Sequence, residues 1–474
     1  MKGKKVRTLL LLGCLLAVTC GAMAYVSMGE SPNAGPLSFP NAGNEILHLS
    51  GQLVQDKVYS GGDGKVSLSL TLTADEVFGP EEASGRNVDM VVVLDRSGSM
   101  RGRKIEDARR AVLELLSCLS PRDRFALVTY SDVVHTICGL KPVEIPHRRE
   151  LSSVVGAIQA GGSTNLGAGL QRGMNLFLTS KKNGNAGRIL LISDGLANRG
   201  ITDPVALGSI ASMAAEKSFS ISAIGVGNDF NEQLMTHIAD RGTGRYHYLE
   251  DPASLAAAFR QEFRDTRVAA ATSVEILVPL QGGVSLVDAA GYPIEVKNGV
   301  ARILPGDVLS GQSRKLFLTF QIPTGAESTF TIKGIRARYV HAMKHHTAPL
   351  ADDFKVACVT HRDDAIASID KKEWEQKVIQ EDYNKLKEKV GHDIKSGKKD
   401  SALERIGKYF AKQQELNEVI GSSSVDSILR DELQGLRETV DDSFRGPAGE
   451  AARKQKENAK ALQYKGYEGR RSYK

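Results

Sequence analysis

The sequence predicts an α/β fold with a doubly wound, mostly parallel sheet, together with a β-sandwich and a C-terminal helical segment. Three observations lead to this expectation. From residue 86 to residue 264, apolar runs of strand length alternate with amphipathic stretches of helix length, as in strand–helix–strand units. From 265 to 360, short strand patterns are separated by Gly, Pro, Asn and Asp turns. From 361 onward the composition favours helices.

A chain of 474 residues is long for one domain. Hydrophobic residues make up 41% and charged residues 25%, so the composition is that of a globular protein with ample core. We therefore divide the chain by changes of pattern. The expected segments are a signal peptide or membrane anchor (1–24), a linker (25–44), a β-sandwich (45–78 with 265–360), an α/β domain (86–264), a helical segment (361–445) and a disordered basic tail (446–474).

The first 24 residues have the pattern of a secretory signal. Basic residues precede an apolar stretch from Leu9 to Val18, and Ala22-Met23-Ala24 fits a cleavage site. An uncut membrane anchor and lipid attachment at Cys14 or Cys20 are the alternatives. We expect an exported protein of the periplasm, cell envelope or extracellular space, with membrane association possible through this segment. No other stretch is apolar enough to span a membrane, which excludes a channel.

The strand pattern that precedes the α/β domain needs partner strands. Val66, Leu68, Leu70 and Leu72 alternate with polar residues, which is typical of a half-buried strand. Two isolated strands are only marginally stable. We therefore expect the strands before Asp75 to complete the sandwich of residues 265–360, with the α/β domain inserted between them.

The first strand of the α/β domain carries the first candidate site residues. Met90 to Leu94 is an unbroken apolar run, typical of a central strand buried on both faces. Asp95 ends the run, and Ser97 and Ser99 follow before a helix. In open α/β sheets, ligands bind in the crevice at the carboxyl ends of the strands. Carboxylate and hydroxyl oxygens suit Mg²⁺ or Mn²⁺ better than Zn²⁺.

Two later segments complete a recognisable set. Asp95-Arg96-Ser97-Gly98-Ser99 resembles the Asp-x-Ser-x-Ser signature of von Willebrand factor type A (VWA) domains. Gly161 to Leu166 and Ile189 to Gly195 resemble the family's Gly-Gly-Thr-Asn segment and its apolar strand ending in Asp-Gly. Ser163 and Thr164 compete for the third hydroxyl, and adjacency to Asn165 favours Thr164. The resemblance implies a metal ion-dependent adhesion site with these ligands: Asp95, Ser97, Ser99, Thr164 and Asp194.

The resemblance extends to exported bacterial VWA proteins with a β-rich companion domain, and to the inter-α-trypsin-inhibitor heavy-chain type. It implies a non-enzymatic, Mg²⁺- or Mn²⁺-dependent module that binds an acidic residue of a partner protein. The alternative is a structural or assembly component of the cell envelope in which the metal only stabilises a loop. An aspartate-nucleophile phosphatase would need Asp-x-Asp, and Ser97 stands at the second position.

The C-terminal region is expected to form a small helical bundle followed by a tail. Residues 446–474 hold eight Lys or Arg and three Glu with few apolar residues, which predicts disorder. Such a tail could contact anionic lipid or an acidic polymer. Export makes nucleic acid an unsuitable partner, and we expect none. Whether Cys118 and Cys138 pair stays open, because spacing along the chain does not give the distance between them.

Overall fold

The structure is a computed structural model that describes residues 45–77, 86–180 and 184–471. The predicted signal or anchor (1–24) and linker (25–44) lie outside the described residues and stay predictions. Within the described ranges, no helix has both the length and the apolar character needed to cross a membrane. Cys118, Cys138 and Cys358 are free thiols, so the possible pair of Cys118 with Cys138 is not formed.

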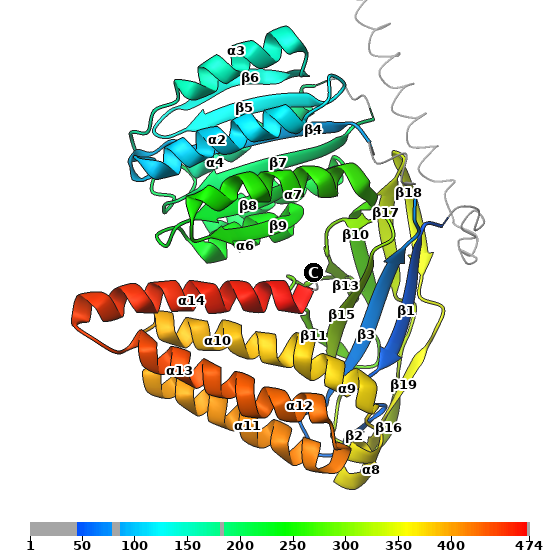
Figure 1. Ribbon diagram of the computed structural model, residues 1–474. Helices are drawn as coiled ribbons and strands as arrows, with labels where there is room; N and C mark the ends of the chain where they lie inside the picture. Colours follow the sequence, from blue (N-terminus) through cyan, green and yellow to red (C-terminus); the bar gives the residue numbers. More distant parts are fainter. Residues whose placement is uncertain (1–44, 78–85, 181–183, 472–474) are drawn as a thin grey trace, which may run out of the picture. The chain divides into compact units, whose positions relative to one another are not determined.

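The α/β domain is built on a six-stranded sheet in which every strand but one runs parallel (Figure 1). The antiparallel strand is β6, at one edge. The order β6-β5-β4-β7-β8-β9 places the first strand in the middle of the sheet, as in a doubly wound fold. The strands are β6 (Val134–Pro142), β5 (Arg124–Tyr130), β4 (Val88–Asp95), β7 (Ala186–Ser193), β8 (Phe219–Val226) and β9 (Thr243–Leu249).

Helices cover both faces of this sheet, which explains the apolar run from Met90 to Leu94 in β4. All eight of its residues are buried. Met90 and Val92 face one core, and Val91 and Val93 face the other. A Cβ at Gly173 would lie 2.5 Å from Cγ2 of Val93, so glycine lets α4 approach the sheet closely. One face holds α2 (Arg103–Cys118), α3 (Ile145–Gly156), η3 (Pro252–Ser254) and α7 (Leu255–Val268), and the other α4 (Leu166–Leu178), α5 (Pro204–Glu216) and α6 (Glu232–Arg241).

Two larger sheets and one small sheet form the β-rich part around a shared apolar core. The first sheet is β1 (Leu47–Leu53), β3 (Lys65–Ala74), β15 (Ser313–Gln321) and β11 (Ser285–Ala289). The second is β12 (Glu295–Lys297), β13 (Val300–Ile303), β10 (Ala269–Pro279), β17 (Arg336–His341) and β18 (Lys344–Pro349), with β14 (Val308–Leu309) beside β10. The small sheet is β16 (Ser328–Ile332), β19 (Phe354–Val359) and β2 (Lys57–Tyr59).

The pairing of β3 with β15 joins strands on either side of the α/β domain in the sequence. The two strands are antiparallel and in register from Lys65 opposite Gln321 to Thr73 opposite Ser313. The domain leaves the sheet after β3 and returns through α7, which ends at Val268, directly before β10 begins. The α/β domain is therefore an insertion in the β-rich part.

The remaining residues form a helical layer with a core of its own, which includes Val54 and Phe317 from the β-rich part. Two short π-helical turns interrupt otherwise continuous helices. In chain order the elements are α8 (Arg362–Ala367), α9 (Lys371–Lys377), η4 (Val378–Asp382), α10 (Tyr383–Lys395), α11 (Lys399–Ile420), α12 (Ser423–Ser427), η5 (Ile428–Glu432), α13 (Leu433–Ser443) and α14 (Ala448–Arg471).

The predicted disorder of the basic tail is wrong over residues 448–471, which form α14 (Figure 1). The helix lies along α10 and touches β9. Two of its basic side chains are buried and bind buried carboxylates: Lys460 Nζ lies 2.8 Å from Glu232, and Arg471 Nη1 lies 2.6 Å from Asp240. Because both partners come from α6, more than two hundred residues earlier, local composition gave no sign of them.

Candidate metal centre

The ends of β4 and β7 bring the predicted site residues together. Asp95 is the last residue of β4, and Asp194 directly follows β7, the parallel neighbour of β4. Ser97 and Ser99 lie in the short loop and 3-10 turn η2 (Gly98–Met100) between β4 and α2. Thr164 comes from the loop before α4. Parallel strands end at the same edge of a sheet, so all of these loops meet in one crevice.

Hydrogen bonds connect the two serines with both carboxylates. The Ser97 and Ser99 hydroxyl oxygens lie 3.0 Å apart, and the Ser99 hydroxyl donates to Asp194 Oδ1 at 2.7 Å. The backbone N–H of Ser97 donates to Asp95 Oδ1 at 2.7 Å, and the Ser193 hydroxyl donates to Asp95 Oδ2 at 2.9 Å. The oxygen atoms are therefore fixed before any ligand binds.

Thr164 faces the same place from the opposite loop. A Cβ added at Gly195 would lie 3.3 Å from the Ser99 hydroxyl oxygen and 3.7 Å from that of Thr164. The loop itself is tied down, because the Thr164 N–H donates to Asn198 Oδ1 at 2.9 Å and the Gly98 N–H donates to the Gly162 carbonyl at 2.9 Å. The structure thus places Thr164 beside the other four predicted residues.

The centre buries more negative than positive charge. Asp95 and Asp194 have no exposed surface. Burial, with a smaller contribution from Asp194, raises the pKa of Asp95 to about 6, although hydrogen bonds from Ser97 and Ser193 oppose the change. Lys104 from the first turn of α2 contacts one of the two carboxylates, with Nζ 2.5 Å from Asp194 Oδ2. Two buried carboxylates beside one ammonium group favour a further cation.

The donor set fits a hard divalent cation. It consists of hydroxyl and carboxylate oxygens without nitrogen or sulfur, which suits Mg²⁺ or Mn²⁺. In the part of the chain that the structure describes, no cluster of three or more His, Cys, Asp or Glu side chains could hold a metal. A centre here therefore depends on the hydroxyl groups of Ser97, Ser99 and Thr164 as much as on carboxylates.

Three residues that sequence reasoning did not select complete the surroundings: Lys104, Ser193 and Asn198. Ser193 ends the strand before Asp194, so its position at a strand end was a usable signal. Lys104 and Asn198 do not stand at the end of a strand, so their positions in the sequence gave no sign that they contact the site. Arg199, which follows Asn198, donates to Asp132 Oδ1 at 2.9 Å.

The doubly wound domain with this oxygen-lined crevice was compared with known protein families. Residues 89–261 match the profile of the von Willebrand factor type A domain. The chain contains a von Willebrand factor type A domain.

Two related proteins each match less than half of the chain. The uncharacterized protein YfbK of Escherichia coli is 32% identical over 40% of this chain. Inter-alpha-trypsin inhibitor heavy chain H4 of Homo sapiens is 29% identical over 46% of it. The chain spans 32% and 24% of the lengths of these two relatives, respectively.

Similarity to solved structures extends well beyond the VWA domain. A von Willebrand factor type A protein from Catenulispora acidiphila superposes with a TM-score of 0.65, covering 89% of this chain and 97% of that one at 16% identity. The ArnB paralog VWA2 from Sulfolobus acidocaldarius gives 0.52, with 89% and 99% coverage at 16% identity. At these identities the likeness concerns the fold, and it supports the expected combination of VWA domain, β-rich part and helical segment.

Proposed function

We propose that this protein is a metal-dependent protein-binding module in which Asp95, Ser97, Ser99, Thr164 and Asp194 hold Mg²⁺ or Mn²⁺. The observation that carries the proposal is the convergence of these five residues, with two fully buried carboxylates, at the carboxyl edge of the sheet. The VWA family, known for metal-dependent adhesion and protein interaction, supports the same function.

The donor set suits recognition of an acidic partner. In this proposal the hydroxyls of Ser97, Ser99 and Thr164 contact the ion, and Asp95 and Asp194 contact it directly or through water. An ion held mainly by neutral hydroxyls keeps positive charge that attracts a further anionic oxygen. A carboxylate of the partner would supply that oxygen. The role of this chain's residues is to hold the ion and keep its surroundings fixed, which requires no chemical step, so we propose binding rather than catalysis.

The surface next to the centre supports an acidic partner with apolar flanks. Arg101 and Arg103, just after Ser99, are exposed. Leu196, two residues after Asp194, is 57% exposed, and Val133 is 58% exposed. Cations can guide an acidic segment toward the site, and the apolar side chains can be covered by neighbours of its carboxylate.

Calorimetric titration of the full chain with Mg²⁺ and with Mn²⁺ tests the centre. We expect saturable binding of one ion, lost in Asp95→Ala and in the double variant Ser97→Ala with Ser99→Ala. Ser117→Ala is the matched control, because this serine lies on α2 and bonds only its own helix, to the Glu114 carbonyl. Equal metal affinity in wild type and the double variant would rule out the site.

A second experiment separates partner binding from loop stabilisation, the alternative function. Immobilised peptides with one Asp, and matched peptides with Asn, are exposed to the protein in Mg²⁺ and in chelator. Capture that requires both Asp and Mg²⁺ supports recognition of a carboxylate. If Mg²⁺ raises only the melting temperature and no peptide is retained, the metal has a structural role.

A further inference from the structure

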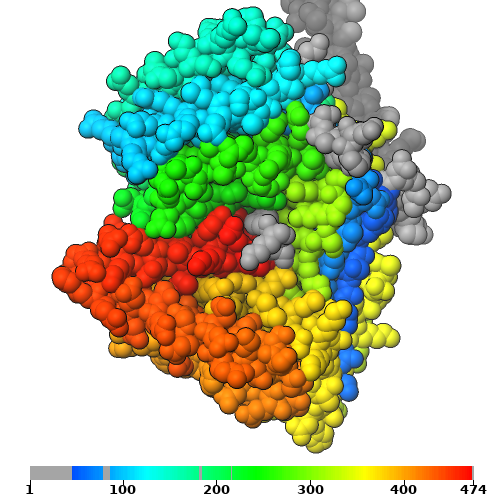
Figure 2. Space-filling view, in the orientation of Figure 1, coloured from blue at the N-terminus to red at the C-terminus, as the bar shows by residue number. Residues whose placement is uncertain are grey.

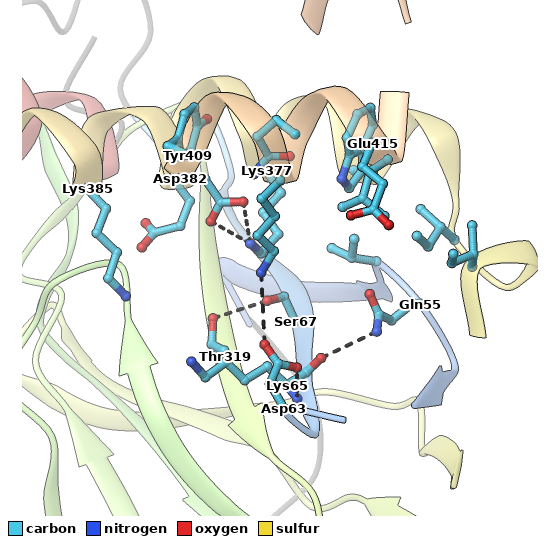
Figure 3. Close-up of a pocket in the computed structure, with 18 of the residues that line it drawn as sticks. Gln55, Asp63, Lys65, Ser67, Thr319, Lys377, Asp382, Lys385, Tyr409 and Glu415 are labelled. Carbon is cyan, nitrogen blue, oxygen red and sulfur yellow. Dashed lines mark hydrogen bonds and ion pairs between the residues drawn. The ribbon is translucent and has the colours of Figure 1, made fainter. Parts of the chain in front are cut away.

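A cavity lies where the helical layer covers the β-rich part. None of its lining residues belongs to the α/β domain that carries the metal centre. Its volume is about 530 Å³, within the range of small-molecule sites. Strands β3 and β15 form one wall through Lys65, Ser67 and Thr319, and helices α8 to α11 form the other. Figure 3 shows Lys377 and Lys385 extending from the helical side toward the strands that carry Ser67 and Thr319.

The walls of this cavity carry an excess of positive charge. Seven lysine or arginine residues and four carboxylate residues line it. Several of the cations already have a carboxylate partner: Lys377 Nζ lies 2.5 Å from Asp382, and Arg405 Nε lies 2.7 Å from Asp393. The seven cationic residues are Lys65, Arg362, Lys377, Lys385, Lys389, Arg405 and Lys412.

Lys65 and Lys389 differ from the other cations. Neither ammonium group has a carboxylate within ion-pair distance among the described residues, while Lys389 has Lys385 and Arg405 as cationic neighbours. Burial, followed by the repulsion from Lys385 and Arg405, lowers the pKa of Lys389. Like charges gathered at one cavity destabilise the fold, which makes this cluster a candidate for ligand binding.

Polar atoms without a partner lie on the same wall. The Tyr409 hydroxyl and Oε1 of Gln413 are inaccessible to solvent and make no hydrogen bond within the described part of the chain. Both residues line the cavity, and Gln413 is only 4% exposed. Oε2 of Glu381, another lining residue, is likewise buried and without a hydrogen-bond partner among the described residues. Buried polar groups are normally satisfied, so these three atoms point to a missing partner.

Apolar side chains form a further part of the lining. Trp374 is 4% exposed, and it shares the cavity with Val54, Ile369 and Leu386. A ligand of this cavity would therefore meet apolar and aromatic surface as well as the basic cluster of Lys65, Lys385, Lys389 and Arg405. Pockets of this composition, apolar with a few converging polar groups, bind small organic molecules.

We propose that this cavity is a binding site for a small organic anion with at least two negative charges at one end, held by the basic cluster. The shared chemistry is that of polycarboxylates and phosphate esters. The site uses no residue of the metal centre, so it is independent of the proposed function.

The test is calorimetric titration of the full chain with two probes, citrate and pyrophosphate. We expect one of them to bind at one molecule per chain. The double variant Lys65→Gln with Lys389→Gln should weaken that binding roughly a hundredfold, because each of the two charge-assisted hydrogen bonds lost costs about tenfold. Which probe binds separates carboxylate from phosphate recognition.

The matched control is Lys297→Gln with Lys333→Gln, which removes the same charge from exposed lysines outside the cavity. This control should bind the probe as wild type does. Asp95→Ala should also bind normally, which separates this site from the metal centre. The proposal is overturned if neither probe binds, or if the control pair weakens binding as much as the cavity pair.

Discussion

Lys104 is the residue whose position bears most directly on metal affinity. Its ammonium group contacts Asp194 Oδ2 at 2.5 Å, and the lysine side chain is only 26% exposed. A cation bound to Asp194 would share this carboxylate with Lys104 or displace it. The ammonium group is therefore a competitor of the metal that is built into the site.

Lys104→Met should strengthen Mg²⁺ binding, by roughly tenfold if one charge-assisted contact is released. The variant should also be less stable without metal, since Asp194 keeps its buried charge without the ion pair. Calorimetric titration measures the first effect and thermal melting in chelator the second. Arg101→Met removes the same charge from the rim without a contact to Asp194 and serves as the control. Weaker Mg²⁺ binding in Lys104→Met would show that the lysine supports the metal instead.

Glu262 is another buried carboxylate, and neighbouring basic side chains balance its negative charge. It accepts hydrogen bonds from Ser222 at 2.7 Å, lies 2.6 Å from Nε2 of His247, and lies 3.4 Å from Arg188. Burial alone would raise its pKa, but Arg188 and His247 outweigh burial and lower the pKa well below its ordinary value. Glu262 therefore stays ionised in the folded protein even in acid.

The contribution of Glu262 to the free energy of unfolding should depend on pH. Because the folded-state pKa is lowered, Glu262 contributes stability above the pKa of the unfolded chain, about 4.5, and this contribution is lost as the pH falls further. In Glu262→Gln we expect lower stability at pH 7, by about 3 kcal/mol, and a shallower decline below pH 4.5. Urea unfolding between pH 3 and 7 measures both. An unchanged acid slope in the variant would contradict this account.

At the scale of elements, α14 shows how a polar sequence becomes a buried helix. Tyr464 and Tyr467 pack edge-on against Tyr246 of β9, with ring centroids 5.7 Å and 5.4 Å apart. The backbone N–H of Tyr246 donates to the Tyr467 hydroxyl at 2.9 Å. The helix therefore supplies both apolar contact and a hydrogen-bond acceptor to the edge strand of the VWA sheet.

Tyr467→Phe should cost about 1–2 kcal/mol, because it keeps the ring but leaves the buried Tyr246 N–H without this acceptor. Urea unfolding of the full chain measures the loss. Tyr59→Phe changes an exposed tyrosine of β2 and should have little effect. Equal stability of Tyr467→Phe and wild type would mean that another group, such as water, satisfies the N–H.

The strands of the VWA domain were predictable because local pattern decides them. Met90 to Leu94 is apolar without a break, and such a run becomes a central strand in any doubly wound sheet. Asp95, Ser97 and Ser99 follow from the end of this strand and the loop after it, whereas Thr164 and Asp194 were predicted from the resemblance of their segments to the VWA family. Their convergence in space agrees with the motif, whereas their binding of metal stays a proposal.

The parts that could not be predicted depend on contacts across the chain. The charge of Arg471 indicated a solvated tail, but in the structure its guanidinium binds Asp240 and lies 4.2 Å from the ring centre of Tyr292. Lys104 was not selected from the sequence, and its partner Asp194 lies 90 residues further along the chain. The sequence around either residue does not indicate its partner, so these two ion pairs are found only in the folded structure.

At the scale of the whole molecule, the end of α14 joins the three parts of the described chain. Arg471 binds Asp240 in the VWA domain and the Gly291 carbonyl in the β-rich part. Arg470 binds Glu381 at 2.6 Å in the helical layer and Asp288 at 2.6 Å in the β-rich part. All of these arginine and carboxylate side chains are largely buried, which makes their loss costly.

Ending the chain after Pro447 should therefore loosen more than the helical layer. Without α14, Asp240 and Glu232 of α6 lose their arginine or lysine partner from this helix, and Tyr246 and Tyr248 lose their aromatic neighbours. We expect faster amide hydrogen exchange in α6 and β9 of the VWA domain as well as in α10. A chain ending after Arg471, which keeps α14, is the control and should exchange as wild type does. If the shorter chain gains exchange only in α10 and α13, the VWA domain is stable without α14, and the buried ion pairs serve the helical layer alone.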